Sequence, residues 1–331
     1  MDKLTKNEYK LLHRLISFSQ QEVKKFMLAY LRKHYSKVIE RDGFILAEGI
    51  SPICVIAHLD TVFDYQFNPK NLYYDKEQGV LWCPTGAGFD DRAGIFAIIK
   101  LIQKGHLPHL ILCCDEEVGG RGASAVVKSY PHNLPFKECK YFVELDRAGF
   151  NDMVFYDCEN SEFTKYIEQF GFVERMGSFT DISILCPHFK IAGVNLSIGY
   201  EYEHSTNEML FLKPLFDTIY AVENMILSSP KEEVPKFEYI PGGWTKYVGE
   251  RFGVSLPITG YKCEKCGEEE FFEDEMFPVL ALDGTTKLFC PNCVAEHVAW
   301  CKICHGAYEK ISPEEGYSGV CDLCKEEKNN G

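Results

Sequence analysis

The sequence lacks the features that mark membrane, secreted and nucleic-acid-binding proteins. Its 331 residues contain no apolar run of the ~18 residues that a membrane-spanning helix needs. The first ten residues, MDKLTKNEYK, have no secretory apolar core, which predicts a cytoplasmic protein. Positive charge is scarce, with 35 lysines and arginines against 49 acidic residues, so nucleic acid is not expected as a partner. The 46% hydrophobic content excludes a disordered chain.

Cysteine is abundant, and its 15 residues fall into two groups. Seven are scattered in or beside apolar runs, and we expect them to be buried free thiols. The other eight form four C-x-x-C pairs: Cys263/Cys266, Cys290/Cys293, Cys301/Cys304 and Cys321/Cys324. Two such turns complete a tetrahedral site, so the tail is predicted to hold two structural Zn²⁺ ions. Sequential pairing of the turns is favoured over crossed pairing, which stays an alternative.

The cysteines also divide the chain into domains. We expect a catalytic domain over residues 1–228, a connecting segment over 229–260 and a double zinc-ribbon domain over 261–331. Prolines and glycines interrupt the connecting segment, although its aromatic residues predict that it packs along a surface. The ribbon domain carries 7 basic and 15 acidic residues, a net charge of −8. A protein is therefore a better candidate partner for this tail than nucleic acid.

The catalytic domain alternates between strand and helix patterns. Alternation of this kind predicts an α/β fold of three layers, with a mostly parallel, mixed sheet between helices. Strands are expected over 53–57, 109–114, 140–145, 152–157 and 193–199. Helices are expected over 6–36, 91–105, 122–130, 161–171 and 206–229.

Metal-binding side chains follow several of the predicted strands. These residues are His58 and Asp60, Glu116 and Glu117, Asp146, and His204. A glycine-rich loop, GAGFDDRAG, adds Asp90 at the start of a helix. Each motif alone is more often structural, but the carboxyl ends of parallel strands meet at one edge of a sheet. Together they predict a site for two divalent metal ions, because Zn²⁺ accepts imidazole and carboxylate ligands.

These motifs resemble those of the co-catalytic di-zinc aminopeptidases in content and order. The matching segments are AHLDTV (57–62), GAGFDDRAG (86–94), DEEVGGRGA (115–123), ELDRAG (144–149) and EHSTNE (203–208). The resemblance implies that Asp90 bridges two metals, one held by His58 and Asp146 and the other by Glu117 and His204. It further implies that Glu116 is the general base and that Asp60 orients His58. A cis peptide bond between Asp90 and Asp91 is also implied.

The chain departs from the family pattern near its substrate site. Thr180-Asp181-Ile182 stands where compact relatives often have Ser-Asp-His, which leaves Asp181 as a substrate-binding candidate. Arg147, next to a predicted ligand, is a second candidate, with a surface ion pair as its alternative. The 31 residues between His58 and Asp90, and the 57 between Asp146 and His204, leave no room for an inserted domain.

The combined reading is a metal-dependent hydrolase. The favoured activity is that of an aminopeptidase, which cleaves a peptide or amide bond with a metal-activated water and Glu116 as base. A deacylase or carboxypeptidase of the same clan is one alternative, and an inactive relative that binds another protein is a second. The expected cofactors are two catalytic divalent metals, with zinc favoured, and two structural Zn²⁺. The expected substrate is a peptide or an N-acylated small molecule.

Overall fold

A computed structural model gives the fold of most of the chain. It describes residues 3–63, 72–177 and 179–242, and, in the tail, residues 261–267, 269–271, 277–282, 285–290, 293–294, 297–301, 307–310 and 318–319. The chain forms two compact units, Met1–Tyr247 and Val248–Gly331, and each is described by itself. No helix in these described ranges is long and apolar enough to cross a membrane.

The first unit is built on an eight-stranded mixed sheet in the order β1-β2-β6-β3-β7-β10-β8-β9. Its four central strands, β6, β3, β7 and β10, run parallel, and both edges contain antiparallel pairs. The strands are β1 (Lys37–Arg41), β2 (Phe44–Glu48), β3 (Ser51–His58), β6 (Pro108–Cys113), β7 (Phe142–Arg147), β8 (Asp152–Val154), β9 (Val173–Glu174) and β10 (Gly193–Ser197). The sheet confirms the predicted mostly parallel core.

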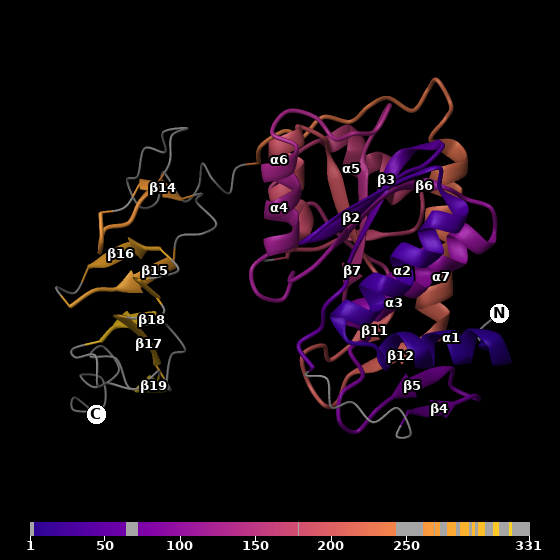
Figure 1. Ribbon diagram of the computed structural model, residues 1–331, viewed down its shortest axis with the longest axis horizontal. Helices are drawn as coiled ribbons and strands as arrows, with labels where there is room; N and C mark the ends of the chain where they lie inside the picture. Colours follow the sequence, from indigo (N-terminus) through magenta and orange to yellow (C-terminus); the bar gives the residue numbers. More distant parts are fainter. Residues whose placement is uncertain are drawn as a thin grey trace. The chain divides into compact units, whose positions relative to one another are not determined.

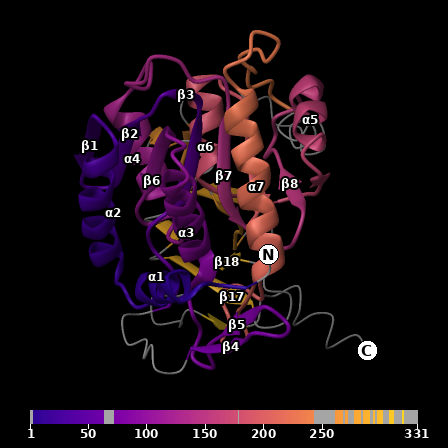
Figure 2. The same cartoon turned by 90° about the vertical axis from the view of Figure 1, so that its right-hand side faces the viewer.

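Helices cover both faces of this sheet (Figures 1 and 2). The helices are α1 (Lys6–Ile16), α2 (Gln20–His34), α3 (Phe89–Gln103), α4 (Arg121–Ser129), α5 (Ser161–Glu168), α6 (Asp181–Phe189) and α7 (Leu212–Ser228). Side chains of α4 and α6 pack in one hydrophobic cluster, and those of the other five helices pack in a second. Strand β3 serves both, because Val55 faces the larger cluster and Ile56 the smaller. The predicted three-layer architecture is confirmed.

The predicted N-terminal helix over 6–36 is wrong as a single element. The structure has two helices, α1 and α2, separated at Ser17 to Ser19. Ser19 caps α2 by accepting a hydrogen bond from the Glu22 amide, while the Glu22 carboxylate accepts one from the Ser19 amide. This reciprocal cap starts a new helix, although the apolar spacing continues across the break.

The predicted helix over 206–229 is also too long at its start. Met209–Phe211 form strand β12 of a second, four-stranded sheet, and α7 begins only at Leu212. This small sheet has the order β11-β12-β5-β4, with β4 at Tyr73–Asp75, β5 at Val80–Trp82 and β11 at Tyr200–Glu201. Pairing of β12 with β5 overrides the local helical pattern. The sheet places the glycine-rich loop after β5 near the β11–β12 loop that carries His204.

The seven scattered cysteines are buried free thiols, as predicted. Residues 229–242 also pack on the first unit. The Phe237 amide donates to the Lys140 carbonyl at 2.9 Å, and the Gly242 amide donates to the Asp157 carbonyl. Phe237 is 5% exposed within the larger hydrophobic cluster. This part of the connecting segment therefore contributes to the core of the first unit.

The described part of the second unit consists of short strands. A five-stranded sheet has the order β16-β15-β18-β17-β19, and β13 pairs with β14. The strands are β13 (Tyr261–Lys262), β14 (Glu269–Phe271), β15 (Phe277–Leu280), β16 (Thr286–Phe289), β17 (Val298–Cys301), β18 (Ala307–Glu309) and β19 (Ser318–Gly319). Its hydrophobic cluster centres on Val279, Phe289, Val298 and three cysteines, and is far smaller than those of the first unit.

Candidate metal centre

His58 and Asp146 meet at the carboxyl ends of the neighbouring parallel strands β3 and β7. The His58 Nε2 atom lies 3.2 Å from Asp146 Oδ1 and 2.9 Å from Asp90 Oδ1. His58 is 1% exposed. The same nitrogen thus faces two carboxylates from different elements, as expected for ligands that share one ion.

His204 and Glu117 form a second group on the other side of Asp90. The His204 Nε2 atom lies 2.9 Å from Glu117 Oε2 and 3.1 Å from Asp90 Oδ2. One Asp90 oxygen therefore faces each imidazole. This is the arrangement that a carboxylate needs to bridge two metal ions ~3.5–4 Å apart.

The glycine-rich loop aims Asp90 between the two groups. Gly88, which precedes α3, has φ +64°, and a Cβ atom there would lie 2.6 Å from Thr61 Oγ1. The peptide bond between Asp90 and Asp91 is cis, as the resemblance implies. Asp91 is fully buried and accepts hydrogen bonds from the amides of His58 and Gly94. Asp91 therefore links the loop to the end of β3.

Asp60 connects His58 to the turn that follows β6. Its Oδ1 atom lies 3.2 Å from His58 Nδ1 and accepts a hydrogen bond from the Glu116 amide at 3.0 Å. Its Oδ2 atom accepts one from the Glu117 amide at 3.1 Å. An acceptor on Nδ1 fixes the ring orientation and leaves Nε2 for a metal. Asp60 thus lies where it could orient His58, and this role, which the resemblance implies, stays a prediction.

Three side chains hold Asp146. Thr180 Oγ1 donates to its Oδ2 atom at 3.0 Å, and the Tyr200 hydroxyl donates to Oδ1 at 3.2 Å. The Asn195 side chain spans the Asp146 backbone, accepting from its amide at 3.0 Å and donating to its carbonyl at 2.7 Å. Sequence reasoning did not find these partners of Asp146, since they come from three separate elements and carry no motif.

Glu208 is a further residue that the sequence analysis missed. It is fully buried, and its carboxylate accepts hydrogen bonds from the amides of Ala87, Gly88 and Asp90 at 3.1, 2.6 and 3.0 Å. Glu208 lies four residues after His204, so it ties the loop of one ligand to the loop of another. The EHSTNE segment contains Glu208 as its last acid, but the sequence of the segment does not show which amides this carboxylate binds.

The electrostatics of this cluster favour cations. His58, Glu116 and Asp146 offer ligand atoms within 4.8 Å of one another, as do His58, Asp90 and Glu117. Burial and repulsion by Asp146 raise the pKa of Glu116 to about 9. Burial, reinforced by the charge of Asp90, raises the pKa of Asp146 to about 6. Crowded, buried carboxylates that oppose their own ionisation are stabilised by bound positive charge, so the donor set fits divalent ions.

The two residues predicted to bind substrate, Arg147 and Asp181, already have partners or are buried in the structure. The Arg147 guanidinium lies 3.7 Å from Asp152 and donates to the Met176 carbonyl, which is the ion-pair alternative weighed from the sequence. Asp181 is 0% exposed beside Cys113, and burial raises its pKa to about 7. Substrate binding by either residue stays a prediction.

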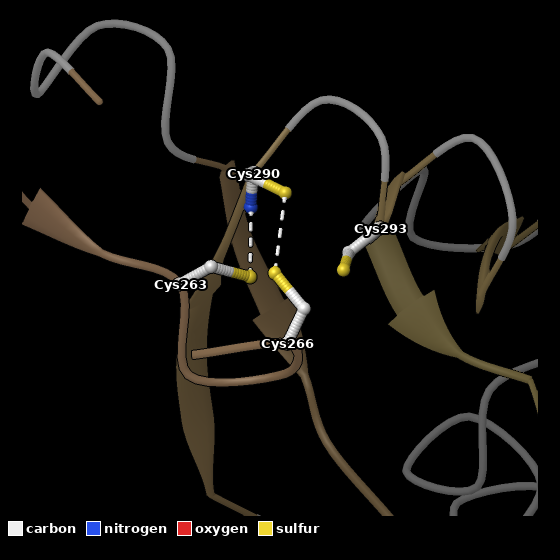
Figure 3. A group of neighbouring side chains, drawn as sticks. All are labelled: Cys263, Cys266, Cys290 and Cys293. Carbon is white, nitrogen blue, oxygen red and sulfur yellow. Dashed lines mark hydrogen bonds between the residues drawn. The ribbon is translucent and has the colours of Figure 1, made fainter. Parts of the chain in front are cut away.

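In the second unit, four cysteines form a separate cluster (Figure 3). The sulfurs of Cys263, Cys266, Cys290 and Cys293 lie within 4.8 Å of one another. Cys266 and Cys290 are 3.9 Å apart at sulfur, close to the ~3.8 Å edge of a tetrahedron with Zn–S bonds of about 2.3 Å. Burial raises the pKa of the Cys263 thiol, but hydrogen bonds from the amides of Cys266 and Cys290 outweigh this effect. The resulting pKa is lowered to about 6. The cluster brings the first two C-x-x-C turns together in the sequential order.

Of the second predicted cysteine site, one cysteine lies among the described residues. Cys301 ends β17, but Cys304, Cys321 and Cys324 lie outside the described residues. Lys265, between the cysteines of the first turn, forms an ion pair at 2.5 Å with Glu309 of β18. The first turn is thereby linked to the strands that follow the cluster.

Comparison with known proteins gives a fold but no sequence family. No family model matches the chain, and no curated protein sequence does either. Its structure is similar to that of aminopeptidase PepT from Bacillus cereus ATCC 10987, with a TM-score of 0.56, 15% identity and coverage of 70% of this chain and 100% of that one.

Two other peptidase structures are similar to it. A tripeptidase from Staphylococcus aureus subsp. aureus Mu50 has a TM-score of 0.54 and 12% identity, with 68% of this chain and 98% of that chain covered. A TET aminopeptidase from a marine sediment archaeon, Thaumarchaeota archaeon SCGC AB-539-E09, has a TM-score of 0.51 and 15% identity, with 67% and 97% covered. The chain therefore has the α/β fold of these peptidases, which confirms the predicted fold class.

Proposed function

We propose that this protein is a metal-dependent aminopeptidase whose centre holds two divalent ions. The observation that carries the proposal is the position of Asp90, with one carboxylate oxygen 2.9 Å from His58 and the other 3.1 Å from His204. The likeness in fold to aminopeptidases and a tripeptidase supports peptides as substrates over N-acylated amines. The imidazole and carboxylate ligands favour zinc, since Zn²⁺ accepts both.

The residues divide into ligands, a base and supports. His58 and Asp146 would hold one ion, Glu117 and His204 the other, and Asp90 both. Bound divalent ions would supply Lewis acidity at the scissile carbonyl and lower the pKa of the attacking water. Glu116, which lies with His58 and Asp146 but is not needed to complete either ligand set, would take the water's proton and deliver it to the leaving amine. Asp60 would hold His58 in the ligand orientation.

The experiment that tests this proposal compares Glu116→Gln with the parent protein on aminoacyl, N-acyl and dipeptide substrates. Glu116→Gln removes the base but keeps the shape, so we expect turnover to fall by at least about a thousandfold, in the range of a lost general base, with metal content unchanged. Glu162→Gln, at an exposed position on α5, is the matched control. A Glu116→Gln protein that hydrolyses the substrates at the parent rate would disprove the assigned role.

For the tail, we propose that Cys263, Cys266, Cys290 and Cys293 bind a structural Zn²⁺. Closed four-thiolate sites stabilise a fold and leave no position for a substrate. A second such site, built from Cys301, Cys304, Cys321 and Cys324, completes the proposal for the ribbon domain. The seven buried free thiols of the first unit support a reducing compartment such as the cytoplasm.

A further inference from the structure

The break between α1 and α2 faces the loops of the metal centre. Arg92, which is 1% exposed at the start of α3, donates to the carbonyls of Leu15 and Phe18 on one side. On the other side it donates to the carbonyls of Leu59 and Asp60, at 2.6 and 3.1 Å. A small cavity between the two sides is lined by residues that include Ser17, Ser19, Gln20, Asp60 and Thr61. The buried guanidinium thus fixes the helix break against the segment that follows His58.

Gln20, the first residue of α2, reaches from this break to the turn that contains the proposed base. Its Oε1 atom accepts a hydrogen bond from the Asp115 amide at 2.8 Å, and its Nε2 atom donates to Asp115 Oδ1 at 2.8 Å. The two bonds are reciprocal, so the amide group of Gln20 matches both a donor and an acceptor of one residue. The partners are 95 residues apart in the sequence.

Asp115 needs such support because of its backbone. Its φ is +57°, in the left-handed region that most L-residues avoid. Asp115 immediately precedes Glu116, and its conformation sets the direction in which the chain leaves β6. Asp60 holds the next two amides, those of Glu116 and Glu117. The turn is therefore held by Gln20 at its first residue and by Asp60 at the following two.

We propose that Gln20 is a positioning residue for the general base, and that the helix break is the device that delivers it. This inference rests on the proposed function, since it assumes that Glu116 is the base. The side-chain hydrogen bonds of Gln20 go to Asp115, and not to a proposed ligand or to Glu116. Its loss would let the strained turn at Asp115 relax and move the Glu116 carboxylate. His58, held by Asp60 and Asp91, and Asp90, held by Glu208, would stay in place.

Exchanging the amide of Gln20 and the carboxylate of Asp115 tests whether their reciprocal hydrogen bonds hold the turn. Gln20→Glu places a carboxylate against Asp115 and loses the donor, so it should disturb the turn. Adding Asp115→Asn supplies a new donor, because the introduced side-chain amide can donate to one oxygen of the introduced carboxylate while the backbone amide of residue 115 still donates to the other. Gln21→Ala, at the next and exposed position, is the matched control. The zinc-loaded full chain is assayed for kcat, KM and metal content.

We expect Gln20→Glu to lower kcat by about ten- to a hundredfold, with KM and metal content close to the parent values. The double variant should recover kcat to within about threefold of Asp115→Asn alone. Gln20→Ala, expected to lower kcat by about tenfold, replaces Gln20→Glu if that protein does not fold. The inference is overturned if the Gln20 variants match Gln21→Ala in kcat, or if the swap recovers nothing.

Hydrogen–deuterium exchange separates this inference from the proposed function. Gln20→Glu should raise deuterium uptake in the peptide spanning Asp115–Gly120, and the double variant and Gln21→Ala should not. If the parent protein hydrolyses no peptide, the proposed function fails, whereas the exchange result still decides whether Gln20 holds the turn. Unchanged uptake in Gln20→Glu would overturn the positioning role even in an active protein.

Discussion

The two candidate metal sites of this chain are built in opposite ways. The centre in the first unit collects its candidate ligands from five separate segments between residues 58 and 204: the ends of β3 and β7, the start of α3, and the turns after β6 and β11. The four-cysteine cluster draws all its ligands from two C-x-x-C turns within residues 263 to 293. The first site depends on the fold around it, because its candidate ligands are far apart in the sequence and only the tertiary structure brings them together.

This difference indicates whether the protein positions the metal ligands by itself or whether the metal organises the protein. In the first unit, a large core and buried supports such as Asp60 and Glu208 fix the ligands through the protein's own hydrogen bonds. In the second unit the described hydrophobic cluster is small and includes three of the ligands. Small domains with little core need a metal or disulfides to fold. We expect the first site to survive loss of its metal and the second to collapse.

The largest effect is expected from Cys263→Ser. Structural Zn²⁺ contributes about 10–16 kcal/mol to zinc-finger peptides, so removing one thiolate should release the ion and unfold the ribbon domain. Zinc content by mass spectrometry should fall by at least one per chain, and limited proteolysis should cut the tail rapidly. Hydrolysis by the first unit should stay within about twofold of the parent rate. Retention of zinc by this variant would contradict the four-cysteine site.

The next effect is expected from Asp90→Asn, which removes the bridging charge. Metal content of the first unit should drop, and kcat/KM should fall by about a thousandfold or more, equal to about 4 kcal/mol. The melting temperature should change little, in contrast to the tail variant. Asp217→Asn, in an exposed pair with Lys213 on α7, is the control. An Asp90→Asn protein that binds two ions as tightly as the parent would rule out the bridge.

A smaller effect is expected from Glu208→Gln. The substitution replaces one carboxylate oxygen with an amide group that cannot accept from the loop amides, so the loop that carries Asp90 loosens. Metal affinity should fall about 10- to 100-fold, the range found when partners of metal ligands are changed. Competition with a chromophoric chelator measures this change, with the exposed Glu232→Gln as control. Unaltered affinity would show that the loop is held by its backbone alone.

The sequence predicted which residues converge at the candidate metal centre, but, apart from Asp60, not the residues that hold them in place. His58 and Asp146 lie at the carboxyl ends of buried apolar strands, and Glu117 lies in the turn after a third, so strand periodicity and the rules of parallel sheets bring them to one edge. The roles of Gln20 and Glu208 depend on contacts across about 95 and 120 residues, which no local pattern encodes. The strand at Met209–Phe211 was missed for the same reason, because only its pairing with Val80–Trp82 distinguishes it from the start of α7.

The buried ammonium group of Lys140 determines how far the first unit must extend. Its Nζ atom donates to the carbonyls of Ser229, Lys231 and Val234, at 2.9, 3.1 and 2.7 Å. A chain cut after residue 228 would leave this charge buried without these acceptors and would remove Phe237 from the larger hydrophobic cluster. A shortened protein for crystallisation or assay should therefore end after Gly242 and not at the end of α7.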